Sequence, residues 1–478
     1  MIPLDKFKEE CGIFGIFGSS DAAVNTALGL HALQHRGQEA AGIVTMDGEN
    51  FSAHFADGLV ADNFTSPEVV KKLEGDSAIG HVRYSTAGKK TARNYQPIYA
   101  QLSCGFLALA HNGNLTNANT LRKKLIKQGA IFQSTMDTEV IIHLIALSHK
   151  ATLIEKVVDA TTQVEGAFSL VILHQDGIIA LRDPYGVRPL SIGRLNDSYV
   201  VASETCALDI IGAKFERDIS HGEMVTINKD GVKSFKPFAT KSPKFCIFEY
   251  VYFSRPDSSV EGKSVYEMRK NIGAELAREI RIDADVIVPI PDSGVPAAIG
   301  YSVESAIPFE LGIIRNHYVG RTFIEPTDRI RNFGVKLKHN ANLSVIKGKR
   351  VILIDDSIVR GTTSKKIVQM IRAAGAKEVH MLIASPPTIS PCFYGIDTPD
   401  KKDLVASSNS ILEITKMIGA DTLGYISIDG LYRAITNTKR NNENSQYCDA
   451  CFTNDYPIHL TDKMGEGMPL LDSIVKKG

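Results

Sequence analysis

Two adjacent carboxylates follow an apolar run in the second half of the chain. Residues 351–354 are apolar, which is enough for a buried parallel strand, and Asp355 and Asp356 come next. Residues 357–363 are rich in small and hydroxyl side chains, and the apolar spacing of 364–374 is helical. A helix N-terminus after a polar loop binds phosphate, and paired carboxylates bind hydroxyl groups and a hard cation such as Mg²⁺. The alternative interpretation is an ordinary strand–turn–helix of an α/β domain.

A second candidate centre begins at Cys11, directly after a charged leader at residues 1–10. If the leader is removed as a propeptide, Cys11 carries both a thiol and a free α-amine. The pKa of an α-amine, near ~8, lets it act as the base for its own thiol, so that no histidine partner is needed. The alternative is a buried cysteine at the start of a strand.

Three polar segments whose side chains could bind glutamine follow Cys11 along the chain. They are His-Arg-Gly-Gln-Glu at 35–39, His-Val-Arg-Tyr at 81–84 and His-Asn-Gly-Asn at 111–114. The planar guanidinium of Arg83 suits a carboxylate, and Asp137 is an anion for an ammonium group. The Asn112 amide and the Gly113 N–H are suitable donors for an oxyanion. Asn-Gly is also the strongest hairpin-turn signal, and one turn can serve both roles.

Length and composition bound the class of protein. The 478 residues predict two or three domains with an ample core. The 54 basic residues balance the 54 acidic ones, so there is no charge pattern for nucleic acid or an anionic membrane. No apolar run has the length of a membrane span, and residues 1–10 lack a secretory signal core. We expect a cytoplasmic protein whose seven cysteines are ligands or nucleophiles before disulfides.

The order of apolar runs divides the chain into two domains of different class. Residues 11–235 alternate short apolar runs with turns and have helical patterns at 22–34 and 138–147, which predicts stacked sheets with flanking helices. Residues 236–244 contain two prolines and are a plausible linker. In 245–440, strands at 286–289, 351–354 and 379–384 show the βαβ rhythm of a parallel sheet, and 441–478 is a tail. We therefore predict an α+β domain followed by an α/β domain.

The order of about eight motifs over residues 11–460 resembles a known family. The segments from Cys11 to Asp137 resemble the glutamine amidotransferases with an N-terminal nucleophile, and 350–363 resembles the phosphoribosyl-pyrophosphate (PRPP) motif of type I phosphoribosyltransferases. Together they are similar to the glutamine PRPP amidotransferases, in the branch with a propeptide and an iron–sulfur cluster. The resemblance implies an αββα glutaminase domain, then a phosphoribosyltransferase domain. It also implies formation of 5-phosphoribosylamine from PRPP, with ammonia from glutamine, in the first committed step of purine biosynthesis.

The resemblance implies a role for each matched residue. Cys11 is the nucleophile, Asn112 and Gly113 stabilise the oxyanion, and Arg83 and Asp137 hold glutamine. Ser293, Asp355 and Asp356 ligate one Mg²⁺ per subunit together with PRPP. The PRPP-binding residues are Asp355, Asp356, Ser357, Val359, Arg360, Gly361, Thr362 and Thr363. A polar, cation-rich stretch at 317–340 would close over PRPP as a lid.

Cys448 and Cys451 are a chelating pair, and Cys246 and Cys392 lie in segments that match the cysteine-bearing ones of this branch. The four imply one [4Fe–4S] cluster per subunit, although zinc, a redox pair or no metal role are alternatives for the same thiols. Cys104 and Cys206 are expected in the core. The implied partners are glutamine, PRPP and purine nucleotide inhibitors, with no nucleic acid and no membrane, in a homotetramer.

Two rival functions share part of this pattern. One is an amidotransferase that delivers ammonia to a sugar phosphate through an isomerase domain. The Asp355-Asp356 loop argues against this function. The other is a non-enzymatic regulator that senses PRPP, which would not need Cys11 or Arg83 and would normally carry a nucleic-acid-binding module.

Overall fold

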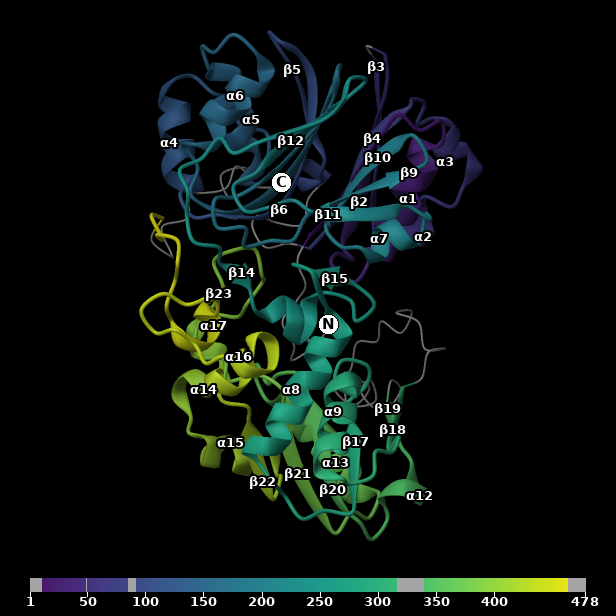
Figure 1. The fold of residues 1–478 in the computed structure, drawn as a ribbon, viewed down its shortest axis with the longest axis vertical. Helices are drawn as coiled ribbons and strands as arrows, with labels where there is room; N and C mark the ends of the chain where they lie inside the picture. Colours follow the sequence, from purple (N-terminus) through teal and green to yellow (C-terminus); the bar gives the residue numbers. More distant parts are fainter. Residues whose placement is uncertain (1–10, 49, 85–91, 316–338, 463–478) are drawn as a thin grey trace, which may run out of the picture.

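The computed structural model describes residues 11–48, 50–84, 92–315 and 339–462. These residues form two bodies, the N-terminal one in purple to teal and the C-terminal one in green to yellow (Figure 1). The expected propeptide at 1–10 and most of the expected lid, at 316–338, lie outside the described residues. Among the described helices, none combines the length and the apolar character that crossing a membrane requires.

The N-terminal body contains two antiparallel sheets. The first has the order β11-β9-β10-β1-β4-β2-β3. Its strands are β1 (Gly12–Phe17), β2 (Ala40–Asp47), β3 (Asn50–Asp57), β4 (Ser77–Arg83), β9 (Ser191–Leu195), β10 (Ser198–Ala202) and β11 (Lys214–Asp218). The second has the order β13-β12-β8-β7-β6-β5. Its strands are β5 (Ile98–Leu102), β6 (Gly105–Leu115), β7 (Gly166–His174), β8 (Gly177–Arg182), β12 (Met224–Asn228) and β13 (Gly231–Phe235).

Three apolar cores stack this body into four layers. Side chains such as Ile13, Ile79 and Val171 pack between the two sheets. Helix α1 (Ala22–Ala32) packs on the outer face of the first sheet. Helices α4 (Ala118–Lys127), α5 (Thr138–Leu147) and α6 (Leu153–Thr161) cover the outer face of the second. The predicted αββα architecture is confirmed. The shorter helices are α2 (Val60–Asn63), α3 (Pro67–Lys71), α7 (Cys206–Asp209) and η1 (Ala92–Asn94).

Two of the covering helices were not anticipated by the sequence pattern. Helix α4 buries only Leu121 and Leu125, so its apolar periodicity is too sparse to stand out. Helix α6 starts with a capping box formed by Thr152 and Glu155, a local signal that was overlooked.

The C-terminal body is built on a parallel sheet with the order β17-β20-β21-β22. The strands are β17 (Val286–Pro289), β20 (Arg350–Asp355), β21 (Glu378–Ile383) and β22 (Thr422–Tyr425). Along β20, Val351 and Leu353 face α13 (Thr362–Ala373) and α15 (Ile411–Ile418), whereas Ile352 and Ile354 face α8 (Val265–Glu279), α9 (Val295–Ser305) and α16 (Ile428–Thr436). The fourth strand, β22, was not predicted because it is only four residues long and only its last residue, Tyr425, is buried.

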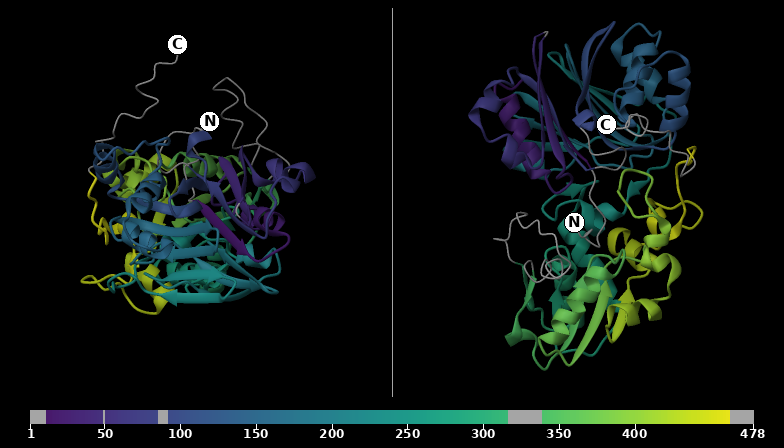
Figure 2. Two further views of the ribbon diagram at one scale, coloured as in Figure 1. Left: turned by 90° about the horizontal axis from the view of Figure 1, so that it is seen from above. Right: turned by 180° about the vertical axis from the view of Figure 1, so that it is seen from behind.

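Small elements complete this body and join it to the first. They are β14 (Phe245–Cys246), the π-helix η2 (Glu249–Phe253), β15 (Ser259–Val260), β16 (Lys263–Ser264), β18 (Ile313–Arg315), β19 (His339–Ala341), α12 (Leu343–Ile346), η3 (Lys401–Asp403), α14 (Val405–Ser408), β23 (Tyr447–Cys448) and α17 (Ala450–Thr453). The view from behind in Figure 2 again shows the two bodies stacked, with the yellow C-terminal segment reaching their border. There the Thr116 hydroxyl donates to the His459 carbonyl at 2.8 Å.

Candidate functional site

Cys11 lies at the start of β1, in a buried position beside the end of β4. Gly12 pairs with Val82, which places Cys11 next to Arg83. The Cys11 thiol lies 3.5 Å from the Tyr84 carbonyl oxygen. Burial raises the pKa of this thiol to about 11 because it penalises the thiolate, and the negative charges of Asp137 and Glu39 act in the same direction, against Arg83. The thiol is therefore protonated at neutral pH while Cys11 remains joined to the leader.

Asn112 and Gly113 lie inside β6, opposite Ser169 and Phe168 of β7. The hairpin-turn interpretation of Asn-Gly is therefore wrong, because long-range strand pairing has overridden the local turn preference. The Asn112 side chain is fully buried, and neither of its amide atoms has a hydrogen-bond partner among the described residues. An orphaned buried amide costs roughly 1–3 kcal/mol, so its presence indicates a ligand oxygen as the missing partner.

Gly113 adopts a φ of +144°, and a Cβ there would lie 2.0 Å from the Ala167 carbonyl oxygen. Only glycine fits this backbone position. Two residues further along β6, the Leu115 N–H donates to Asp137 Oδ2 at 2.9 Å. Asp137 also caps α5, since its Oδ1 accepts from the Thr138 N–H at 2.8 Å. The strand that carries Asn112 and Gly113 thus also holds the carboxylate of Asp137, the predicted ammonium-binding residue, in place.

The fold therefore gathers residues from three other segments, at 39, 83–84 and 137, around Cys11. Arg83 and Asp137 both act electrostatically on its thiol, as predicted neighbours should. Glu39 was missed as a member of this group, although its segment had been singled out. The Glu39 N–H donates to the Arg83 carbonyl at 3.1 Å. This bond holds the segment of Glu39 next to Arg83, the predicted carboxylate-binding residue.

A buried histidine, His111, lies at the same N-terminus of α5 as Asp137. Its Nδ1 lies 3.1 Å from the Thr138 hydroxyl and 3.9 Å from Asp137 Oδ1. Burial lowers the pKa of His111 because it penalises the imidazolium, despite the opposing charge of Asp137. The His111 ring is therefore neutral at pH 7.

The acidic pair stands at the carboxyl end of β20, where ligands of parallel sheets bind. Asp355 and Asp356 are both almost fully buried. The Asp356 N–H donates to Asp355 Oδ1 at 3.0 Å, and the Ser357 hydroxyl donates to Asp356 Oδ2 at 2.7 Å. Gly361 adopts a left-handed conformation with φ +80° and starts α13 at Thr362. The polar loop therefore ends at a helix N-terminus, as predicted for phosphate binding.

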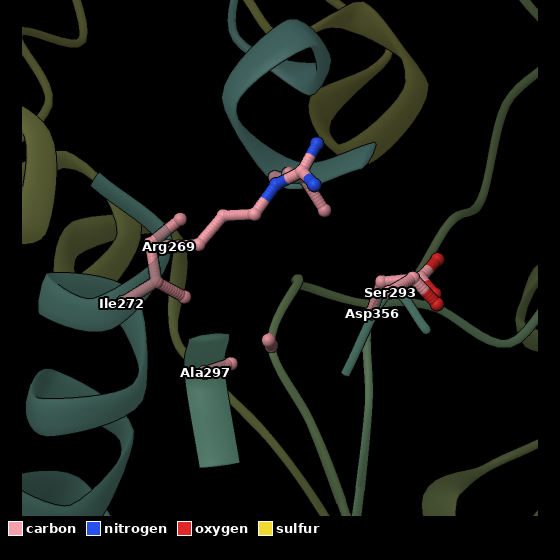
Figure 3. A pocket seen from close by; sticks show the side chains of 7 residues that line it. Arg269, Ile272, Ser293, Ala297 and Asp356 are labelled. Carbon is pink, nitrogen blue, oxygen red and sulfur yellow. The ribbon is translucent and has the colours of Figure 1, made fainter. Parts of the chain in front are cut away.

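Ser293 and Asp356, two predicted Mg²⁺ ligands, line one pocket of about 200 Å³. Figure 3 shows them on one side of it, with Arg269 and Ile272 of α8 on the other. Arg269 was not found by sequence reasoning, because nothing local to α8 marks it. Its Nε donates to the Tyr250 carbonyl at 2.9 Å, and its charge interacts with that of Asp356.

The four predicted cluster cysteines come together beneath the border of the two bodies. Cys246 of β14 pairs with Cys448 of β23, and Cys451 and Cys392 pack against the same core. All four are free thiols. Burial raises the pKa values of Cys246, Cys448 and Cys451, and the charges of the other thiols raise them further. Four such groups ionise together only when a cation or an iron–sulfur core balances their charge.

Within the described part of the chain, no three or more His, Cys, Asp or Glu side chains are spaced to hold a single metal ion. Tetrahedral zinc would need sulfurs about 3.8 Å apart, since Zn–S bonds are about 2.3 Å. A four-iron cluster accepts four thiolates over a wider span. Four thiols are the donor set of a four-iron cluster, and zinc can use the same set.

Comparison with known proteins settles the family. The chain is 56% identical over 470 residues to an amidophosphoribosyltransferase of Rhizobium etli, covering 97% of this chain and 95% of that protein. It is 50% identical to the amidophosphoribosyltransferase of Bacillus subtilis, covering 95% of each. The chain belongs to the amidophosphoribosyltransferase family. It also matches a chloroplastic member from Arabidopsis thaliana at 48% identity, over 98% of this chain and 83% of that one.

Family models and a solved structure agree with this membership. A glutamine amidotransferase domain matches residues 81–209, and a phosphoribosyl transferase domain matches residues 263–385. The Bacillus subtilis glutamine PRPP amidotransferase complexed with ADP and GMP superposes with a TM-score of 0.89 at 49% identity, covering 94% of this chain and 98% of that one. The phosphoribosyl match removes the isomerase-type rival, and the amidotransferase match removes the regulator.

We predict that Cys11 reacts slowly with iodoacetamide in the chain that retains residues 1–10. With a pKa of about 11, the thiolate fraction at pH 7 is about one part in 10⁴, so alkylation should speed up about tenfold per pH unit towards pH 11. A chain beginning at Cys11 should react at least about tenfold faster at pH 7, because the adjacent α-ammonium favours the thiolate. Peptide mass spectrometry measures both rates, with buried Cys206 as the unreactive control. Equal rates for the two chains would contradict the role of the terminal amine.

Proposed function

We infer that this protein converts PRPP, glutamine and water to 5-phosphoribosylamine, glutamate and pyrophosphate, the entry reaction of purine biosynthesis. The observation that carries this inference is the orphaned, buried amide of Asn112. It lies on the strand that also holds Asp137, whose charge acts on the Cys11 thiol. The second body holds a buried acidic pair at a strand end. One centre suits attack on an amide, and the other suits a phosphorylated sugar.

At the first centre, we propose that the Cys11 thiolate attacks the glutamine amide carbon. The Asn112 amide and the Gly113 N–H donate to the oxyanion, so that they contribute in the transition state more than in the ground state. Arg83 would bind the α-carboxylate, and Asp137 the α-ammonium group. Ammonia leaves, and water hydrolyses the γ-glutamyl thioester. The α-amine of Cys11 takes and returns the proton, which requires removal of the propeptide 1–10.

At the second centre, Ser293, Asp355 and Asp356 would hold one Mg²⁺ per subunit together with PRPP. The bound ion supplies charge neutralisation for the pyrophosphate leaving group. The loop residues Ser357, Val359, Arg360, Gly361, Thr362 and Thr363 would hold the 5-phosphate at the N-terminus of α13. Exclusion of water protects the sugar carbon from hydrolysis while ammonia attacks it.

A chain of polar contacts supports coupling between the two centres. Arg269, which lines the pocket of Asp356, donates to the Ser254 carbonyl at 2.7 Å. The Ser254 hydroxyl, directly after η2, donates to the Glu249 carboxylate at the start of η2. Glu249 in turn pairs with Arg36 of the first body at 2.6 Å. We propose that PRPP binding and lid closure raise glutaminase activity along this route, so that ammonia is not wasted.

The remaining assignments come from the family. We propose that Cys246, Cys392, Cys448 and Cys451 hold one [4Fe–4S] cluster per subunit, which would cross-link three distant segments. Purine nucleotides are proposed inhibitors, supported by the ADP and GMP in the Bacillus subtilis complex. We further propose domains at 11–235 and 245–440, a homotetramer and a cytoplasmic location.

Replacing Cys11 by alanine should abolish glutamine-dependent synthesis and leave ammonia-dependent synthesis within about twofold of wild type, because only the first centre needs the thiol. Phosphoribosylamine formation from glutamine and from ammonium salts measures the two routes. Cys104→Ala, a substitution of another free thiol, is the matched control. Equal loss of both routes in a folded Cys11→Ala protein would show that the centres are not separate.

Asp356→Asn should lower both synthetic routes by roughly 100-fold or more, because the amide cannot bind Mg²⁺–PRPP as a carboxylate does. The isosteric amide keeps the shape of the site. Glutamine hydrolysis without PRPP should be unchanged. Asp400→Asn, at an exposed side chain of the same body, should leave both routes intact. Full ammonia-dependent turnover in Asp356→Asn would remove this residue from the centre.

Anaerobically purified protein should contain about four irons and four acid-labile sulfides per chain. Cys448→Ser should lose most of that iron, whereas Cys104→Ser should keep it. Elemental and sulfide analysis gives the metal, and intact mass on the same sample shows whether the chain begins at Cys11. Zinc, or full iron retention in Cys448→Ser, would give the four cysteines another role.

A further inference from the structure

A loop of the second body lies directly against the backbone of β6, the strand of the first body that carries Asn112 and Gly113. Gly395 adopts a φ of +111°, and a Cβ built there would lie 2.9 Å from both the Cα and the carbonyl carbon of Gly113. The Asn114 side-chain amide donates to the Phe393 carbonyl at 2.9 Å, across 279 positions of sequence. Residues 391–395, which we name the wall loop, therefore touch β6 where Asn112 and Gly113 lie.

The wall loop is itself held in place by buried groups. The Nε of Arg188 donates to the Tyr394 carbonyl at 2.9 Å, and Arg188 is fully buried. The Tyr394 hydroxyl donates to the Ile458 carbonyl at 2.7 Å. The backbone nitrogen of Tyr394 lies 3.3 Å from the sulfur of Cys392. The loop thus has a fixed position relative to both bodies.

Arg188 also joins the loop to the strand opposite the oxyanion residues. The Ser169 hydroxyl donates to the Arg188 carbonyl at 3.2 Å. Ser169 faces Asn112 across the β6–β7 ladder. One buried arginine therefore positions the wall loop and borders the ladder that carries Asn112.

Close backbone neighbours flank Gly113 on two sides. On one side the Ala167 carbonyl would lie 2.0 Å from a Cβ at Gly113, and on the other Gly395 approaches the Gly113 backbone. Displacement of reacting groups by about 1 Å costs about 100-fold in rate, so the direction of the Gly113 N–H is sensitive to both contacts.

We propose that the wall loop is a positioning element of the glutaminase centre, with Gly395 backing Gly113 and the Phe393 carbonyl anchoring Asn114. Through these contacts the second body sets the geometry of the oxyanion donors in the first. Gly395 and Phe393 touch no reacting atom and act through Gly113 and Asn114. This inference rests on the proposed glutaminase role of Cys11.

The test is Gly395→Ala in the full, processed protein. Glutamine hydrolysis should lose about 10- to 100-fold in kcat with KM changed less than about threefold, because the oxyanion exists only after attack. Affinity for a γ-aldehyde analogue of glutamine, whose thiohemiacetal needs the same donors, should fall by a similar factor. Alkylation of Cys11 by iodoacetamide, ammonia-dependent synthesis and iron content should remain as in wild type.

Gly419→Ala is the matched control, because Gly419 has a φ of +79° in the same body and no atom within 4 Å of a built Cβ. It introduces backbone strain without contact with β6. Asn114→Ala, which removes only the bond to Phe393, provides a second variant should Gly395→Ala fold poorly, and should lower kcat in the same direction.

Unchanged kcat and aldehyde affinity in both Gly395→Ala and Asn114→Ala would overturn the positioning role. So would a fall in the glutamine and ammonia routes by one common factor, since that indicates general loss of structure. Absence of glutamine hydrolysis in the wild-type protein would instead overturn the proposed function itself.

Discussion

A buried ion network at the border of the two bodies is the constraint on which the arrangement of the centres depends. Arg36 pairs with Glu204, which lies in the same first body, and with Glu249 of the second body. Arg188 lies 3.4 Å from the same Glu249 carboxylate. All four side chains are almost completely buried. Burial alone would raise the pKa of Glu204, but the Arg36 charge holds that pKa well below its usual range. Arg36 and Glu204 therefore stay ionised at neutral pH.

Such a network specifies position more than it adds stability. Burying charges costs several kcal/mol per ion, roughly balanced by pairing, whereas removing one partner costs about 3–5 kcal/mol. Only one relative placement of the bodies keeps every charge paired. Arg36 is followed by Gly37, where a Cβ would lie 2.6 Å from the Arg83 nitrogen, so the network also sets the glutamine side of the first centre.

The first centre retains a polar group that the described residues leave without a partner. The Asn112 amide is buried without a protein partner among the described residues, and the thiol of Cys11 is held far from ionisation. An orphaned buried amide lowers stability, which is the pattern expected where a protein keeps a polar group for a ligand. The four cysteine thiols are likewise gathered in one core, and burial raises the pKa values of Cys246, Cys448 and Cys451.

The amino-acid sequence is enough to predict elements whose signals are local. Helix α5 and strand β17 lie at the predicted residues, and the acidic pair stands at the end of β20 as expected. These signals are an apolar run, a period or a turn residue, each complete within about ten positions. The αββα and parallel-sheet classes followed from their order. Helices α4 and α6 and strand β22 were not predicted, because their apolar faces are short or sparse.

Which distant residues meet depends on the tertiary fold. Pairing with β7 places Asn112 and Gly113 inside a strand, because it outweighs a two-residue turn preference. The fold also brings Arg269 to the Asp356 pocket and Gly395 against Gly113, and no residue near them in the sequence predicts those contacts. The physical reason is that such contacts depend on packing between segments that are far apart in the chain, whereas sequence patterns record the conformational preferences of adjacent residues.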